Sequence, residues 1–384
     1  YATPLVVGAA ALWGPLLWRA RRPDRPLGSW WAMVGLAAGS FPAAGFLANT
    51  LGWWRFPMPP LAWLTLTAGL ALGIGLIAYL APRYLPQVLV RRRQPRVLPE
   101  NQTTTRTFWA TRWGAVGVVS LVSALVLLVD PFWGERLTRD APLGPPTILG
   151  ARFFGYSNPA FTVLATSVVL ACGLLAGQVK VNRRPGPTAA GIAVVGLALV
   201  GMLGMPSLGA DFGGAIAVAA AFVVLVAATL GLPLNWKTGA MALVVGGIAG
   251  TVVAGWDYAR GPERWTHLGA FVDTVLQGGL GDILMRKGAM WLRLSLAPAV
   301  GLILVAFVLR WLHHRGVLKV YQTEARAVGL RLRPLAAGLA ALWMVGSLIN
   351  DSGLVVAVMG LCLAGPLLGV VGTGRVRAGR DGKG

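Results

Sequence analysis

The sequence has few charged residues, two cysteines and three histidines. Charged residues make up 12% of its 384 positions and hydrophobic residues 56%, which excludes the surface of an ordinary soluble globular protein. The cysteines Cys172 and Cys362 lie within apolar runs and match no disulfide or metal-ligand spacing, so we interpret them as small core residues. No nucleophile motif, P-loop, dinucleotide fingerprint or HExxH motif is present. The sequence therefore assigns no reaction type.

Long apolar runs dominate the sequence. A helix that crosses ~30 Å of hydrocarbon needs about 20 mostly apolar residues, and eleven such stretches are separated by polar or Pro/Gly-rich breaks. An outer-membrane barrel would instead show ~10-residue alternating segments, so the pattern predicts an all-α, polytopic transmembrane helix bundle. The predicted spans are about 2–18, 28–48, 60–81, 113–130, 158–178, 187–206, 213–232, 238–256, 294–312, 335–350 and 354–372.

The net charge of +21 is distributed unevenly over the loops. Since Lys and Arg are retained on the cytoplasmic side of a membrane, we expect the Arg-rich loops to be cytoplasmic, the N-terminus outside and the C-terminus inside. The charge then reflects topology and attraction to acidic lipid headgroups, and we expect no nucleic-acid partner. The cytoplasmic loops contain 25 of the 34 basic residues and four of the 13 acids: 19–27, 82–112, 179–186, 233–237, 310–334 and the basic tail 373–384.

Polar residues cluster beside the breaks on the expected outer side. Three predicted spans, 158–178, 213–232 and 354–372, run from outside to inside, so their unpaired N–H groups and positive dipole ends lie at the outer leaflet. Such helix ends suit an anion such as phosphate, and Arg can hold a phosphate with two hydrogen bonds. The candidate substrate-binding residues are Arg152, Asn158, Arg264, Arg286, Lys287 and Asn350.

Three further residues on this side are candidates for catalysis: Asp211, His267 and Asp351. The two acids would repel an anion unless a divalent cation bridged them to it, or unless one acted as a base beside His267. An imidazole near its unperturbed pKa of ~6.5 can transfer protons at neutral pH. The alternative is structural: Asn158, Asp211 and either Asp351 or Ser352 are also suitable N-caps for the three spans.

The longest expected outer loop, residues 257–293, contains an amphipathic segment at about 267–284. Its apolar residues recur at roughly helical spacing, which predicts a helix lying in the membrane interface. This helix would roof a lateral opening for a lipid headgroup; alternatively, it packs against the bundle without acting as a gate.

Five ordered motifs carry a resemblance to a known family: FLANTLGWWR, GARFFGYSNPAF, PSLGADFGG, RWTHLGAFVDTVLQGG followed by RK, and NDSG. They span about residues 40–355. The sequence resembles a family of bacterial polytopic envelope membrane proteins in which a domain similar to alkaline phosphatases and sulfatases precedes the membrane region. The resemblance implies such an extracytoplasmic domain upstream of Tyr1, which is also expected from an N-terminus that lies outside.

These features favour a protein of the bacterial cytoplasmic membrane that binds a lipid-linked phosphate or glycan at the outer leaflet for processing of a cell-envelope polymer. The expected partners are membrane lipids, including a polyprenyl-phosphate-linked substrate, and the upstream domain; the sequence indicates no oligomeric state. One alternative is a proton-coupled transporter or flippase that uses Asp211 and His267. A second is a membrane anchor or assembly subunit without catalysis.

Overall fold

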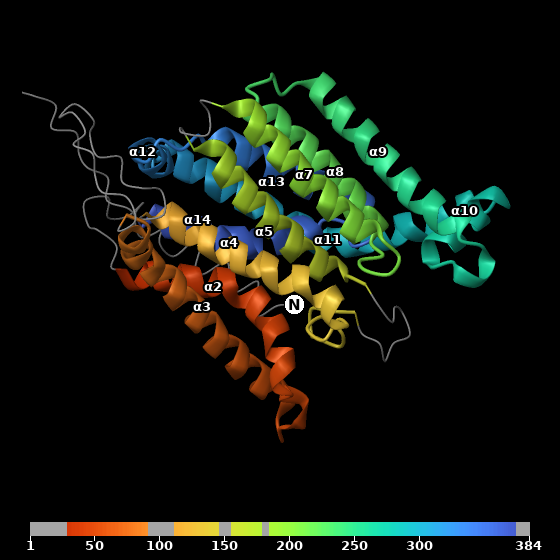
Figure 1. Ribbon diagram of the computed structural model, residues 1–384, viewed down its shortest axis with the longest axis horizontal. Helices are drawn as coiled ribbons and strands as arrows, with labels where there is room; N and C mark the ends of the chain where they lie inside the picture. Colours follow the sequence, from red (N-terminus) through yellow and green to blue (C-terminus); the bar gives the residue numbers. More distant parts are fainter. Residues whose placement is uncertain (1–28, 91–110, 146–154, 179–183, 374–384) are drawn as a thin grey trace, which may run out of the picture.

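The computed structural model describes residues 29–90, 111–145, 155–178 and 184–373. These residues form an α-helical bundle (Figure 1), and the one β-bridge among them joins Gln178 to Leu330. The α-helices are α2 (Ser29–Leu47), α3 (Pro59–Val90), α4 (Arg112–Val129), α5 (Asn158–Gly177), α7 (Pro185–Gly204), α8 (Phe212–Thr229), α9 (Trp236–Ala259), α10 (His267–Leu276), α11 (Leu280–His314), α12 (Lys319–Ala327), α13 (Leu332–Ile349) and α14 (Val355–Gly372).

Ten of these helices are long and apolar enough to cross a membrane, namely all except α10 and α12. Each contains or closely overlaps one predicted span, which confirms the all-α, multi-pass class. The predicted span 2–18 lies outside the described residues, as does all of the tail 373–384 after Thr373.

Helices α5 and α8 form the centre of the bundle. Helix α5 packs against α4, α13 and α14, and α8 packs against α7, α9 and α13. Both are apolar around their whole circumference and mostly buried, as expected of helices that other helices surround. By contrast, α3, α7, α9 and α11 leave large apolar side chains uncovered, which is the surface that a lipid bilayer would cover.

Small residues permit the closest helix contacts. Gly35 and Gly39 of α2 lie against α14, where an added Cβ would come within 2.7 Å of Val370 and 2.4 Å of Leu367. Gly246 and Gly250 of α9 face Ile216 of α8 in the same way. Two small residues four positions apart let helix backbones approach closely inside a membrane, so these pairs fix how α2 and α9 attach to the bundle.

The segment between α9 and α11 differs from the prediction of one interfacial helix at 267–284. Helix α10 ends at Leu276, and the chain turns at Gly278, whose φ of 90° suits glycine. Helix α11 then begins at Leu280 and continues for 35 residues, so the charged stretch before residue 294 is part of the spanning helix. Hydropathy locates the apolar part of such a helix but not its polar extension.

The two ends of the bundle differ in their charged residues. Helix α13 begins within the basic stretch 310–334 and ends at Ile349, next to Asn350 and Asp351. In Figure 1, α12 and α10 accordingly lie at opposite ends of the bundle. The short amphipathic helix α12, which was not predicted because its sequence KVYQTEARA is polar, packs against α14 at the basic end.

Candidate functional site

A cavity of about 470 Å³ lies between the first turns of α5 and α8, helix α10, the first two turns of α11 and the end of α13. Its volume is within the range of ~300–1,000 Å³ that is typical of small-molecule sites. The structure brings together seven of the nine candidate residues in its wall: Asn158, Asp211, His267, Arg286, Lys287, Asn350 and Asp351.

The two other candidates do not line this cavity. Arg264 is exposed in the 3-10 helix Pro262–Arg264 that precedes α10, and it is absent from the cavity wall. Arg152 lies outside the described residues. The site therefore contains Arg286 and Lys287 as its basic residues.

Asn158 joins the start of α5 to the turn between α13 and α14. Its Nδ2 donates to Asp351 Oδ1 at 2.9 Å and also to Ser352 Oγ. The prediction of Asn158 as N-cap was wrong, because the extended residue Ser157 takes that position and its Oγ accepts from Ala160 N. The amide of Asn158 is thus available to hold Asp351 in the cavity wall.

Asp211 is the N-cap of α8, as predicted, and its Oδ1 accepts from Gly214 N at 2.9 Å. The backbone before it is held tightly: Asp211 N donates to Leu203 O at 2.8 Å, and Ala210 is fixed at a φ of 46°. A residue other than glycine is strained at a positive φ, and this conformation persists only where the surrounding structure imposes it. The surrounding loop therefore determines the position of the Asp211 carboxylate.

Gly213 provides the space that the Asn350 side chain occupies. A Cβ at Gly213 would lie 2.6 Å from Asn350 Oδ1 and 3.0 Å from its Cγ, which is closer than real contacts allow. Asn350 is buried, and its Nδ2 donates to Gly346 O at 3.2 Å. The first turn of α8 and the end of α13 are therefore in direct contact at the cavity.

A side chain of α11, and not a capping side chain within the turn itself, holds the turn that begins α14. The predicted cap by Asp351 or Ser352 was wrong: the N-cap residue is Leu354, without a side-chain cap bond. Its N–H instead donates to Ser295 Oγ of α11 at 3.1 Å. Asp351 remains in the cavity wall, because Asn158 holds it from the other side.

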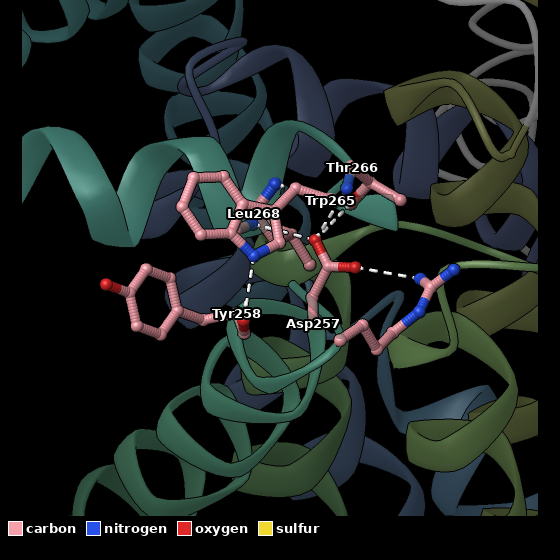
Figure 2. A network of polar contacts seen from close by, with 7 residues as sticks. Asp257, Tyr258, Trp265, Thr266 and Leu268 are labelled. Carbon is pink, nitrogen blue, oxygen red and sulfur yellow. Dashed lines mark hydrogen bonds and ion pairs between the residues drawn. The ribbon is translucent and has the colours of Figure 1, made fainter. Parts of the chain in front are cut away.

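The fully buried carboxylate of Asp257 attaches α10 to the end of α9 (Figure 2). Its Oδ2 accepts from Thr266 N at 2.9 Å, from Thr266 Oγ1 at 2.7 Å and from Gly269 N at 2.7 Å, while Oδ1 accepts from Arg260 at 2.9 Å. Figure 2 also shows the Trp265 indole N–H donating to Tyr258 O, at 2.7 Å. These bonds fix the start of α10 and, with it, His267 at the cavity.

A second set of bonds supports the start of α5. Glu135 Oε1 accepts from Gly155 N at 2.8 Å, and the Tyr156 hydroxyl donates to Leu127 O at 2.5 Å. Tyr156 N in turn donates to Gly209 O at 2.9 Å, in the loop that precedes α8. Burial raises the pKa of Glu135, although its bond to Gly155 opposes the shift. The segments that carry Asn158 and Asp211 are therefore linked to one another.

Arg286 and Lys287 are exposed at the cavity and form no ion pair or hydrogen bond with any residue that the structure describes. By contrast, one Asp351 oxygen is bonded to Asn158 and one Asp211 oxygen to Gly214. The two basic side chains are therefore the groups most available to a bound anion.

No group of three or more His, Cys, Asp or Glu side chains within the described ranges could hold a metal ion. The wall contains two carboxylates and one exposed imidazole, on three separate helices or turns. The wall therefore combines two basic side chains, two amides and helix N-termini, which can contact an anion, with two carboxylates and His267.

Sequence reasoning missed Asp257 as a residue that organises the site. A carboxylate in the last turn of a helix faces the negative end of the helix dipole, which is unfavourable unless other donors compensate. Asp257 lies in the last turn of α9. Its position in the sequence could therefore have predicted that other hydrogen-bond donors surround its carboxylate. The apolar part of the wall was also missed: Phe212, Leu268, Phe271, Leu280, Ile283, Leu284 and Ile349.

In comparisons with known proteins, no family model, curated protein or solved structure matches this chain.

Proposed function

We propose that this chain is a multi-pass protein of the bacterial cytoplasmic membrane whose cavity binds the phosphate of a lipid-linked substrate at the outer leaflet. The observation that carries the proposal is the position of Arg286 and Lys287, which face the cavity without an ionic partner among the described residues. Arg and Lys form charge-assisted hydrogen bonds with phosphate oxygens, so two such side chains favour an anion over a neutral ligand.

The helix ends support an anionic ligand. Helices α5, α8 and α10 all begin at the cavity, and the first turn of a helix attracts negative charge. Gly213, in the first turn of α8, also lines the cavity. The positive ends of these helices therefore add to the charge of Arg286 and Lys287, although several of their first N–H groups already donate to capping side chains.

The orientation in the membrane is part of the proposal and is supported by the distribution of charge. The cavity and the basic stretch 310–334 lie at opposite ends of α13. Because Arg-rich loops stay in the cytoplasm, we place the cavity at the outer leaflet. There it would receive a lipid-linked phosphate or glycan and present it to an extracytoplasmic domain for processing of an envelope polymer.

The positions of the buried acids favour a binding site over a proton-coupled transporter. Among the described residues, the buried acidic side chains are Asp130, Glu135, Asp211 and Asp257, and all lie at the end of the bundle that carries the cavity. Transporters of the kind considered in the sequence analysis bind substrate and coupling ions near the bilayer midplane. We therefore do not propose transport.

The test is a binding titration with a polyprenyl phosphate and the purified chain in nanodiscs. Arg286→Ala with Lys287→Ala removes both cations and should weaken binding by at least tenfold, since 1.4 kcal/mol corresponds to a factor of ten. Arg293→Ala is the matched control, because Arg293 is exposed on the same helix but does not line the cavity. Equal affinities for the double variant and the control would contradict the proposal.

A further inference from the structure

The cavity wall consists of a polar part and an apolar part, and both continue onto α11. The first two turns of α11 contribute the apolar Leu280, Ile283 and Leu284 and the basic Arg286 and Lys287. The same helix thus places apolar side chains directly beside the two cations. A free phosphate ion has no apolar surface to bury against this wall. A phosphate attached to a hydrocarbon chain does have such a surface, and burying it is favourable.

The apolar part does not end at the cavity. Every fourth residue of α11 from Leu280 to Leu304 is apolar or glycine, and the leucine and valine side chains among them are exposed, for example Leu284 at 61% and Leu296 at 63%. We call this set the α11 row: Leu280, Leu284, Gly288, Leu292, Leu296, Val300 and Leu304. At 1.5 Å per residue it is about 36 Å long, which is comparable to the ~30 Å of a bilayer core.

The α11 row begins at the cavity and winds toward the outside of the bundle. Side chains at every fourth position form a ridge that is inclined to the helix axis. Trp291 and Ser295 mark the side of α11 that faces the bundle, since Trp291 Nε1 donates to Ser347 O at 2.6 Å and Ser295 Oγ accepts from Leu354 N. The row therefore leaves the bundle-facing side near Leu284 and reaches the uncovered side by Val300.

No other described helix covers this surface. Of the ten candidate spans, α11 is the one with the smallest buried share. Gly288 interrupts the row with an open position, where an added Cβ would have no neighbour within 4 Å. A flexible hydrocarbon chain can follow such an apolar surface from the bilayer into the cavity.

We propose that the cavity and the α11 row bind one amphiphile together: a phosphate or diphosphate ester of a long-chain alcohol that enters laterally from the bilayer. Its phosphate lies between Arg286, Lys287 and the helix N-termini, and its chain lies against Leu280, Leu284 and the row. This inference rests on the proposed function and adds to it the surface that binds the hydrocarbon chain and the route by which the ligand enters. Two features carry it, the charge of the cavity and the continuation of its apolar wall along α11.

The test compares an alkyl phosphate of four carbons with one of sixteen, and with inorganic phosphate, in nanodiscs of fixed composition. Leu284→Ser is expected to weaken binding of the long-chain probe by at least fivefold and to leave the short-chain probe within twofold of its original affinity. Leu243→Ser on α9 is the matched control, because Leu243 is an exposed apolar residue that does not line the cavity. This control measures how far a new polar residue on any exposed apolar helix surface changes the partitioning of the probe into the nanodisc.

A second variant tests the row outside the cavity. Gly288→Trp adds a ring to an open position and should weaken binding of the long-chain probe alone, by at least threefold. If neither this variant nor Leu284→Ser changes long-chain binding relative to Leu243→Ser, or if inorganic phosphate binds as tightly as the long-chain probe, the chain does not use the row. The proposed function fails separately, when removal of Arg286 and Lys287 leaves the affinity for every probe unchanged.

Discussion

Asn158 and Asp351, which are 193 positions apart in the sequence, are joined by a hydrogen bond of 2.9 Å from Nδ2 to Oδ1. The bond connects the start of α5 to the turn between α13 and α14 in the wall of the cavity. The donated hydrogen bond stabilises the Asp351 carboxylate in the same wall that contains Arg286 and Lys287. The two residues therefore support each other's positions.

Replacing the amide by a second carboxylate should disrupt this connection. Asn158→Asp would place two acids within hydrogen-bonding distance, and we expect a loss of stability of about 1–3 kcal/mol, measured as a lower midpoint of thermal unfolding in detergent. Adding Asp351→Asn exchanges donor and acceptor and should recover most of the loss. A double variant no more stable than Asn158→Asp would show that the pair does not interact as described.

Gly213 should be required for the packing of Asn350. Gly213→Ala places a Cβ 2.6 Å from Asn350 Oδ1 and should displace that side chain, with a cost of about 1–3 kcal/mol for overpacking and weaker binding of a lipid phosphate. The control is Gly239→Ala in α9, where the new methyl group has no neighbour within 4 Å. Unfolding midpoints and binding isotherms are measured for both; similar losses in the two variants would contradict a specific role for Gly213.

The Asp257 carboxylate should determine how firmly α10 is held. Asp257→Ala removes the acceptor of Thr266 N, Thr266 Oγ1 and Gly269 N, so amide hydrogens of α10 should exchange at least tenfold faster. Asp273→Ala, in the same helix, removes one bond to Gln277 and should leave exchange at the start of α10 within twofold. Unchanged exchange in Asp257→Ala would mean that other contacts hold α10 in place.

The stability of the protein should depend on the protonation of Glu135. Because burial raises the pKa of this carboxyl, its protonated form is favoured in the folded state, and its contribution to stability is present below its ordinary pKa and lost as the pH rises through the raised pKa. Glu135→Gln mimics the neutral form and can still accept from Gly155 N. The unfolding midpoints of variant and native chain should coincide below the ordinary pKa and diverge as the pH rises from the ordinary to the raised pKa, with the variant more stable and the difference constant above the raised pKa; a constant difference at every pH would contradict this assignment.

Much of the fold could be predicted from the sequence, because the hydrocarbon around a membrane-spanning helix requires a long run of apolar residues. A run of about 20 apolar residues has few structures available in hydrocarbon other than a helix, and ten predicted ranges coincide with helices. The polar extension of α11 before residue 294 was not predictable in this way. Its start depends on the left-handed turn at Gly278, which a hydropathy pattern does not register.

The site shows a similar division. The pattern of polar residues beside helix N-termini identified seven residues that line one cavity, since the helix ends at one side of a bundle lie close together. Two caps were assigned wrongly, because capping preferences do not distinguish Ser157 from Asn158 or foresee Ser295 of α11 as the partner of Leu354. Those choices depend on tertiary contacts between residues far apart in the sequence.

The most direct measurement is a cryo-EM map of the chain in nanodiscs that contain a polyprenyl phosphate. The account predicts phosphate density within about 3 Å of Arg286 or Lys287, the distance of a charge-assisted hydrogen bond, and density for the chain along the side of α11 that carries Leu284. Lipid phosphate found elsewhere on the bundle, with an empty cavity at saturating lipid, would contradict the central claim that this cavity is an anion-binding site.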